Sequence, residues 1–206
     1  MSELPFPVAV LVSGSGSNLQ SLLEAAARPG YAAEIVVVIS DRPGVLALER
    51  AATAGVASVV VPWGDFDDRD RFTEAVCDVA ADHGARALVL AGFMRILAPP
   101  AIRRFPNRIL NVHPALLPSF PGAHAVPQAL AYGVKLSGVT VHFVDEEVDH
   151  GPIISQEAVP VLENDDEASL HARIQEAEHR LLPAALDALA RGTLRVTGRH
   201  VVWENA

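Results

Sequence analysis

The chain has 206 residues, half of them apolar, which is enough to bury one sizeable core, so a single domain is expected. Its formal net charge of −9 at pH 7 argues against a nucleic-acid partner, because such binding rests on Lys and Arg contacts to phosphates, but it leaves room for one small anionic ligand. The sequence predicts a cytoplasmic protein without a membrane segment, since no apolar run nears the roughly 20 residues that span a bilayer, the start MSELPFP lacks a basic segment, and Cys77 is the only cysteine.

Apolar, β-rich runs alternate with helical patterns through the first half of the chain. Strands are predicted over 8–13, 33–40, 57–62, 85–92 and 107–113. Helical patterns lie between them, over 19–26, 45–55 and 68–84. Because strands buried on both faces pair in parallel and are covered by helices, this alternation predicts a doubly wound, mostly parallel, Rossmann-like α/β sheet.

The pattern changes after residue 134. Two longer runs with more alternation, 135–145 and 152–161, predict an antiparallel extension of the sheet. Residues 165–192 predict a long amphipathic C-terminal helix that kinks at Pro183. The last stretch, 193–206, predicts a hairpin that turns at Gly198.

The segment SGSGSN, residues 13–18, follows the first predicted strand, and doubly wound sheets bind ligands at the carboxyl ends of their strands. Gly14 and Gly16 permit a tight turn that exposes N–H groups. Ser17 and Asn18 then begin a helix, whose N-terminus favours an anion. A single-phosphate cradle and an ordinary turn capped by Ser17 or Asn18 both fit, and the position at a strand end favours the phosphate.

Two other phosphate-binding motifs are weaker matches to this loop. A dinucleotide fold requires G-x-G-x-x-G, and Leu19 occupies the position of the third glycine. Asp41, at the end of the second predicted strand, keeps that interpretation open because an acidic residue there could hold a ribose. A P-loop requires Gly-Lys-Ser/Thr, which the segment lacks.

The strand predicted over 107–113 ends in Asn111 and His113, which share one face because side chains alternate along a strand. Pro114 favours an extended backbone at His113. Asn111 could simply satisfy a turn, and His113 could be a hydrogen-bonded core residue. An amide and an imidazole at the carboxyl end of a parallel strand are also the two donors that a developing oxyanion requires.

A carboxylate that could charge the imidazole would come from the segment FVDEEVDHGPI, close after His142. It offers Asp145, Glu146, Glu147 and Asp149, most of which we expect to be solvated loop charges. The segment contains none of the usual zinc-binding spacings, so no metal is expected.

Together these segments resemble the phosphoribosylglycinamide formyltransferases, the folate-dependent enzymes of purine synthesis. The resemblance runs through VLVSGSGSNLQSLL, ISDRPGVLALERAATAGV, LAGFMRIL, NVHPALLPSFPGAHA, GVTVHFVDEEVDHGPII and IQEAEHRLLP. It implies transfer of a formyl group from the co-substrate 10-formyltetrahydrofolate to the amine of glycinamide ribonucleotide, without a covalent enzyme intermediate.

The resemblance also implies roles for individual residues. The catalytic trio would be Asn111, His113 and Asp149. Ribonucleotide contacts would come from Gly16, Ser17, Asn18, Gly92, Met94, Gln175 and Glu178. Folate contacts would come from Arg95, Ile96, Leu97, Asn111, Val144, Asp145 and Asp149, with support from Arg69, His124, Thr140 and His142. Residues up to about 100 would form the ribonucleotide-phosphate half of one domain, and residues from about 101 to 206 the catalytic and folate half.

Three alternatives differ in what they require. A methionyl-tRNA formyltransferase would need a C-terminal tRNA-binding domain, which a chain ending soon after its long helix is not expected to hold. A formyltetrahydrofolate hydrolase would need an additional N-terminal regulatory domain. A non-catalytic nucleotide-binding module would keep the phosphate loop without the trio. The expected partners are the two small-molecule substrates, and the protein is expected to be a monomer or a homodimer.

Overall fold

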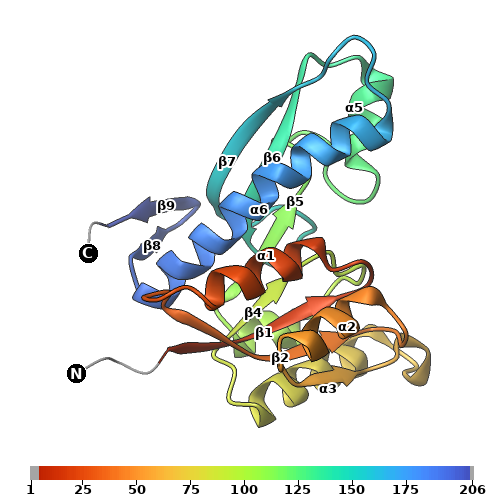
Figure 1. The fold of residues 1–206 in the computed structure, drawn as a ribbon. Helices are drawn as coiled ribbons and strands as arrows, with labels where there is room; N and C mark the ends of the chain where they lie inside the picture. The colour runs from red at the N-terminus through yellow and green to blue at the C-terminus, as the bar shows by residue number, and fades with distance from the viewer. Residues whose placement is uncertain (1–4, 205–206) are drawn as a thin grey trace.

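The computed structural model describes residues 5–204, so residues 1–4 of the start segment and 205–206 of the segment predicted to form a hairpin lie outside it. Within this range one mixed sheet runs through the molecule in the order β3-β2-β1-β4-β5-β6-β7-β9-β8 (Figure 1). Its strands are β1 Phe6–Val12, β2 Ala33–Ser40, β3 Ser58–Val60, β4 Ala87–Leu90, β5 Ile109–His113, β6 Leu136–Phe143, β7 Ile153–Pro160, β8 Leu194–Thr197 and β9 His200–Trp203.

Strand pairing divides the sheet at β5. Strands β1 to β5 pair in parallel, whereas β5 with β6 and β6 with β7 are antiparallel. The C-terminal hairpin joins by a parallel pairing of β7 with β9, and Gly198, with φ of 59°, occupies its turn. The predicted mostly parallel sheet with an antiparallel extension is therefore confirmed.

Six α-helices are described between residues 5 and 204: α1 Ser17–Ala26, α2 Leu46–Thr53, α3 Arg69–Asp82, α4 Pro99–Arg104, α5 Ala125–Tyr132 and α6 Glu167–Arg191. The long C-terminal helix is confirmed as α6, and Pro183 lies inside it. The helices α4 and α5 and a short 3-10 turn at Trp63–Asp65 were not predicted. Each is brief, and α4 begins with two prolines, which are tolerated in the first helical turn.

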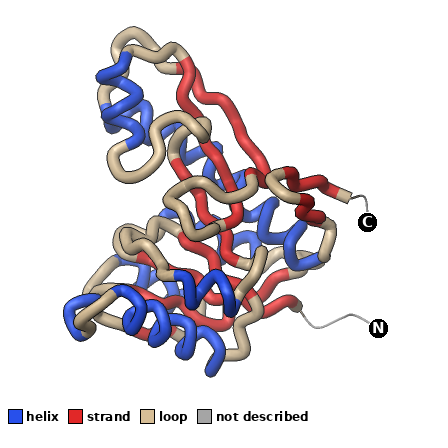
Figure 2. The backbone as a smooth tube through the Cα atoms, turned by 180° about the vertical axis from the view of Figure 1, so that it is seen from behind, coloured by secondary structure: helices blue, strands red, loops and turns tan. Residues whose placement is uncertain are grey.

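Helices cover both faces of the sheet because the central strands are apolar on both sides. Along β1, Val8 and Val10 contribute to a cluster with α1 and α6, whereas Ala9 and Leu11 contribute to a cluster with α3 and α4. Figure 1 shows α1 and α6 in front of the sheet, and Figure 2 shows α3 and α4 on the opposite face. No helix in the described range is both long enough and apolar enough to cross a membrane.

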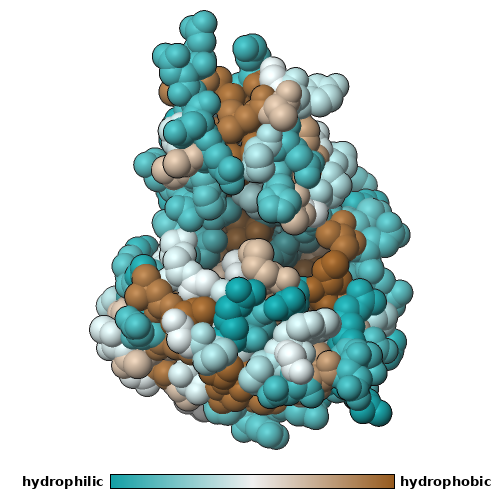
Figure 3. Space-filling model, turned by 90° about the vertical axis from the view of Figure 1, so that its right-hand side faces the viewer, coloured by the Kyte–Doolittle hydropathy of each residue, from teal (hydrophilic) through white to brown (hydrophobic). Residues whose placement is uncertain are grey.

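The fold leaves a hollow at the carboxyl ends of the parallel strands. The strands β6 and β7, with α5 beside their far end, project away from the rest of the molecule (Figure 1). On the face shown in Figure 3 the surface is hollowed between this projection and the main body, and hydrophobic residues line part of the hollow. The chain order also reverses here, since β2 and β3 lie on one side of β1 and β4 on the other. Such a switch point is where open α/β sheets bind ligands.

Candidate active site

The loop between β1 and α1 presents an uncapped helix N-terminus. Gly16 is the N-cap residue, with φ of 71°, and no side chain makes a capping hydrogen bond. The alternative in which Ser17 or Asn18 caps the helix is therefore wrong. A side chain at Gly16 would also meet Ala47, whose Cβ lies 2.7 Å from the position of an added Cβ. The first N–H groups of α1 are thus left to bind an anion.

A cavity of about 270 Å³ opens at this loop. It is bounded by the loop, by the segment that follows β4 and by one face of α6, and it reaches Val112 and Pro114 on either side of His113. All the residues for which the resemblance implied ribonucleotide contacts line it: Gly16, Ser17, Asn18, Gly92, Met94, Gln175 and Glu178. Residues separated by more than 150 positions in the sequence therefore meet at one cavity.

A buried carboxyl group faces this cavity. Glu178 is 4% exposed, and its Oε2 accepts a hydrogen bond of 2.8 Å from Asn18 Nδ2. Burial raises the pKa of Glu178, although the hydrogen bond from Asn18 opposes the shift. A carboxylate that lines a cavity can accept hydrogen bonds from hydroxyl groups of a ligand.

The expected catalytic residues come together at the carboxyl end of β5. Asn111 Nδ2 lies 3.2 Å from Asp149 Oδ1, and His113 Nδ1 lies 3.3 Å from Asp149 Oδ2. His142 joins them, because its Nε2 lies 3.1 Å from Asn111 Nδ2. Asn111 and His142 face each other through the pairing of β5 with β6, and Asp149 comes from the loop between β6 and β7.

Backbone groups of the turn after β5 complete this cluster. The Gly122 N–H donates to Asp149 Oδ2 at 2.7 Å, and the Phe120 carbonyl oxygen lies 2.8 Å from His113 Nε2. Asp149 and Phe120 both adopt positive φ, of 52° and 53°. The side-chain amide nitrogen of Asn111 already faces two partners, His142 Nε2 and Asp149 Oδ1. To donate to a bound oxyanion, Asn111 must give up its hydrogen bond to one of these partners.

The charges in the cluster differ from the arrangement expected from the sequence. Burial lowers the pKa of His113, and the Asp149 carboxylate and the Phe120 carbonyl oppose the shift without reversing it. Burial alone would raise the pKa of Asp149, but His142, His113 and the Gly122 N–H outweigh it, and the pKa of Asp149 is lowered. The free protein therefore pairs an ionised Asp149 with a His113 that favours its neutral form. The sequence offered a carboxylate that could charge the imidazole, but burial, which the sequence does not show, opposes the charged form of His113 in this state.

Asp41 forms ion pairs with Arg42 and Arg95. Its carboxylate is buried and accepts a hydrogen bond of 2.7 Å from Arg95 Nε, with Arg42 nearby. Burial would raise the pKa of Asp41, but hydrogen bonds with Ser13, Arg95 and Arg42 lower it overall. The Asp41 carboxylate therefore already has partners within the protein, which weakens the support for a dinucleotide site.

The remaining residues expected at the folate site differ in exposure. Arg95 is half-buried, Ile96 is exposed and Leu97 is buried. Val144 is half-buried, and its N–H donates to Ile109 O. Asp145 begins the loop that carries Asp149.

The supporting residues have different surroundings. Thr140 donates to Ala115 O at 2.7 Å and accepts from Leu117 N at 3.0 Å, so it holds the turn that follows His113. His142 belongs to the cluster of Asn111, His113 and Asp149. Arg69 is exposed at the start of α3, and His124, with φ of 66°, is exposed just before α5.

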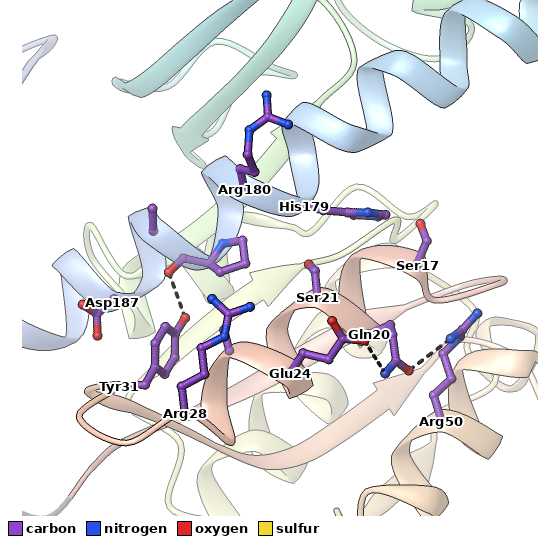
Figure 4. A pocket seen from close by; sticks show the side chains of 13 residues that line it. Ser17, Gln20, Ser21, Glu24, Arg28, Tyr31, Arg50, His179, Arg180 and Asp187 are labelled. Carbon is purple, nitrogen blue, oxygen red and sulfur yellow. Dashed lines mark hydrogen bonds between the residues drawn. The ribbon is translucent and has the colours of Figure 1, made fainter.

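Sequence reasoning missed Arg50. The loop 13–18 contains no basic residue, but Arg50 of α2 donates from Nε to Ser15 O at 2.9 Å and from Nη1 to Gln20 Oε1 at 3.0 Å. Arg50 lines a second cavity, of about 590 Å³, between α1 and α6, where Figure 4 shows the hydrogen bonds that link Arg50, Gln20 and Glu24. No local pattern could have revealed a residue 35 positions from its partner.

The sequence of this chain is similar to those of known formyltransferases. A sequence model described as formyl transferase matches residues 7–186. The phosphoribosylglycinamide formyltransferase of Mycobacterium tuberculosis is 50% identical over 195 residues, which cover 95% of this chain and 90% of that protein. The trifunctional purine biosynthetic protein adenosine-3 of Drosophila melanogaster is 48% identical over 192 residues, which cover 92% of this chain but 14% of that much longer protein.

Solved structures are similar over nearly the whole chain. The crystal structure of glycinamide ribonucleotide transformylase 1 from Symbiobacterium toebii has a TM-score of 0.95 and 44% sequence identity, and the match covers 98% of this chain and 95% of that one. A formyltetrahydrofolate deformylase from Pseudomonas syringae has a TM-score of 0.91 and 29% identity, with 99% of this chain and 67% of that one covered. The chain belongs to the formyl transferase family and, within it, to the phosphoribosylglycinamide formyltransferases.

Proposed function

We propose that this protein transfers the formyl group of 10-formyltetrahydrofolate to the amine of glycinamide ribonucleotide, a step of de novo purine biosynthesis. The observation that carries the proposal is the continuity of the site. The cavity at the uncapped N-terminus of α1 extends to Val112 and Pro114, next to His113 of the catalytic cluster. A phosphorylated ligand held at one end would therefore bring a reactive group to the other.

The ribonucleotide would bind with its phosphate on the N–H groups of Gly16, Ser17 and Asn18. Glu178 would accept hydrogen bonds from the ribose hydroxyl groups, and Gln175 lies one helical turn away on the same face of α6. Gly92, Met94 and the residues of α6 would form the remaining walls. Both halves of the chain would thus contribute to the ribonucleotide site.

The folate would occupy the hollow beyond this cavity. Arg95, Ile96 and Leu97 would contact it on one side, and the segment from Val144 to Asp149 on the other. The exposed apolar side chains of Ile96 and Val148 suit a planar ring system. Asn111 would contact both the folate and the developing tetrahedral centre.

The chemistry would be direct attack of the substrate amine on the formyl carbon. The attacking nitrogen gains positive charge and the formyl oxygen becomes an oxyanion, to which Asn111 would donate a hydrogen bond, joined by His113 once its ring has been protonated. Because burial favours neutral His113 in the free protein, the ring can accept a proton at this stage. The oxyanion and the Asp149 carboxylate would both favour the resulting imidazolium, which would return the proton to the leaving folate nitrogen.

We further propose that the protein acts in the cytoplasm, as a monomer or a homodimer, on these two small molecules and without a metal, a nucleic-acid partner or a membrane. Hydrolysis of 10-formyltetrahydrofolate is a second candidate, favoured by the similarity to a deformylase. A spectrophotometric assay separates the two activities. Transfer requires that folate product forms only when glycinamide ribonucleotide is present, whereas product that forms equally without it would indicate hydrolysis.

Replacing Gly16 with alanine is expected to weaken ribonucleotide binding and to lower the melting temperature. The new Cβ would meet Ala47 and would force a non-glycine residue to keep positive φ, which costs about 1–2 kcal/mol. We expect KM for the ribonucleotide to rise at least tenfold, with little change in the affinity for a folate analogue measured by calorimetry. Gly14→Ala is the matched control, because no atom lies within 4 Å of a Cβ added at Gly14. Equal melting temperatures for the two variants would contradict the packing argument.

Replacing Glu178 with glutamine is expected to stabilise the free protein and to impair the enzyme. A carboxyl group with a raised pKa destabilises the fold increasingly as pH rises above its unfolded value of about 4.5, so the gain in melting temperature should be larger at pH 7.5 than at pH 4.5. Loss of a charged acceptor should raise KM for the ribonucleotide about tenfold or more. Glu176 is exposed on the same helix, so Glu176→Gln should change neither the melting temperature nor KM for the ribonucleotide. A gain that does not depend on pH would contradict the burial of a charged Glu178.

A further inference from the structure

The C-terminal hairpin contacts the loop that carries Asp149. The strand β9 pairs with the start of β7 at His200 and Ile153, and Trp203 Nε1 donates to Ile154 O at 3.0 Å. Arg199, at the turn between β8 and β9, donates from Nη2 to the His150 carbonyl oxygen at 2.6 Å. The hairpin thus holds the residue that directly follows Asp149.

A second set of bonds extends from Arg199 through the same loop. Arg199 Nη1 lies 3.0 Å from His150 Nε2, and His150 Nδ1 lies 2.8 Å from Asp145 Oδ2. The Nδ1–H tautomer of His150 satisfies both contacts, since it donates to Asp145 and accepts from Arg199. The other Asp145 oxygen accepts from Glu147 N at 3.0 Å. Arg199 is therefore connected to both ends of the loop.

The residues on either side of His150 have constrained backbones, so hydrogen bonds from Arg199 matter for the conformation of this loop. Asp149 keeps a positive φ of 52°, which is unfavourable for a residue with a Cβ. Gly151 packs so closely against β6 that a Cβ there would lie 1.8 Å from Phe143 O, so this position has no room for a side chain. The peptide carbonyl of His150 lies between these two constrained residues and receives a charge-assisted hydrogen bond, the stronger kind, from Arg199.

We propose that Arg199 is a positioning residue, which orients the Asp149 carboxylate toward Asn111 and His113 by fixing the loop from Asp145 to Gly151. This inference rests on the proposed function. Arg199 does not act on the ribonucleotide, whose cavity is built from other segments. Its loss should therefore change kcat and leave KM for the ribonucleotide unaltered.

The test compares Arg199→Ala with Arg195→Ala and Arg199→Lys. Arg195 lies on the same hairpin, is also exposed, and pairs with Glu204 instead of the loop. Because Arg199 is exposed, we expect a three- to tenfold fall in kcat for Arg199→Ala, partial recovery with lysine and no change for Arg195→Ala. The melting temperatures of the two alanine variants should be similar. Equal kcat values for these two variants, or a rise in ribonucleotide KM that accounts for the loss, would overturn the proposal.

Hydrogen exchange of the free protein supplies a readout that needs no turnover. Arg199→Ala should speed exchange at the Gly122 amide, which donates to Asp149 Oδ2, and in residues 145–151, compared with Arg195→Ala. Unchanged exchange there would overturn the proposal. If the unmodified protein transfers no formyl group, the proposed function fails, and the exchange comparison still decides whether Arg199 anchors the loop.

Discussion

Replacing His113 with alanine is expected to lower kcat by about 10²–10³, with a much smaller effect on ribonucleotide binding. Removal of one oxyanion donor has an effect of this size in other enzymes. His113 also provides the ring that exchanges a proton with the reacting nitrogens, so the loss falls on the transition state and not on the bound substrate. Its position at the end of β5, beside the ribonucleotide cavity but not among the residues that line it, supports this separation.

Steady-state kinetics and calorimetric titration of the ribonucleotide measure the two effects separately. His83→Ala is the control, because His83 is the C-cap residue of α3 and its Nδ1 lies 2.8 Å from the Val79 carbonyl oxygen of the same helix. The His113 side chain is buried, so circular dichroism and the melting temperature must first show that the variant is folded. A folded His113→Ala protein with kcat within threefold of the unmodified protein would exclude a role in the chemistry.

Asp149→Asn is expected to lower kcat by at least 10² while the fold is retained. The two Asp149 oxygens face the Gly122 N–H, the Asn111 amide and His113, and an asparagine side chain has only one acceptor for these groups. The substitution also removes the charge that opposes the lowering of the His113 pKa. The imidazolium formed during proton transfer therefore loses its main stabilising partner.

A titration by nuclear magnetic resonance tests this electrostatic argument directly. The pKa of His113 should fall further below its ordinary value in Asp149→Asn, because burial then acts with less opposition. Glu146→Gln is the matched control, since Glu146 is an exposed carboxylate on the same loop. A His113 pKa that Asp149→Asn leaves unchanged, or that Glu146→Gln shifts by the same amount, would contradict a direct pairing of Asp149 with His113.

The sequence predicted most of the sheet because its strands carry strong local patterns. The strand predicted over 33–40 has these same bounds in β2, and Asn111 and His113 were placed on one strand face by alternation alone. The sequence did not predict α4 and α5, because helices of six and eight residues are too short to show a clear periodicity. Asp149 was identified only through the family resemblance, because neighbouring carboxylates in the segment look alike in the sequence.

The rest of the site depends on groups that have no signature in the sequence. The Phe120 carbonyl and the Gly122 N–H could belong to any residue type, and only the path of the turn brings them to His113 and Asp149. Arg199 reaches His150 across 49 positions. The pKa of His113 follows from burial, which results from packing of the whole fold.

The two faces of the sheet would be completed at different times during synthesis on the ribosome. The buried apolar cluster on the α3 and α4 side uses residues from Ala9 to Ile109, so its members have all been made when just over half of the chain has been translated. The cluster on the other side joins Val8 and Leu19 to residues of α6 as late as Leu186. Until α6 leaves the exit tunnel, the nascent chain exposes the apolar surface of β1 and α1 that α6 later covers. Apolar surface that is exposed in this way is prone to aggregation until α6 covers it.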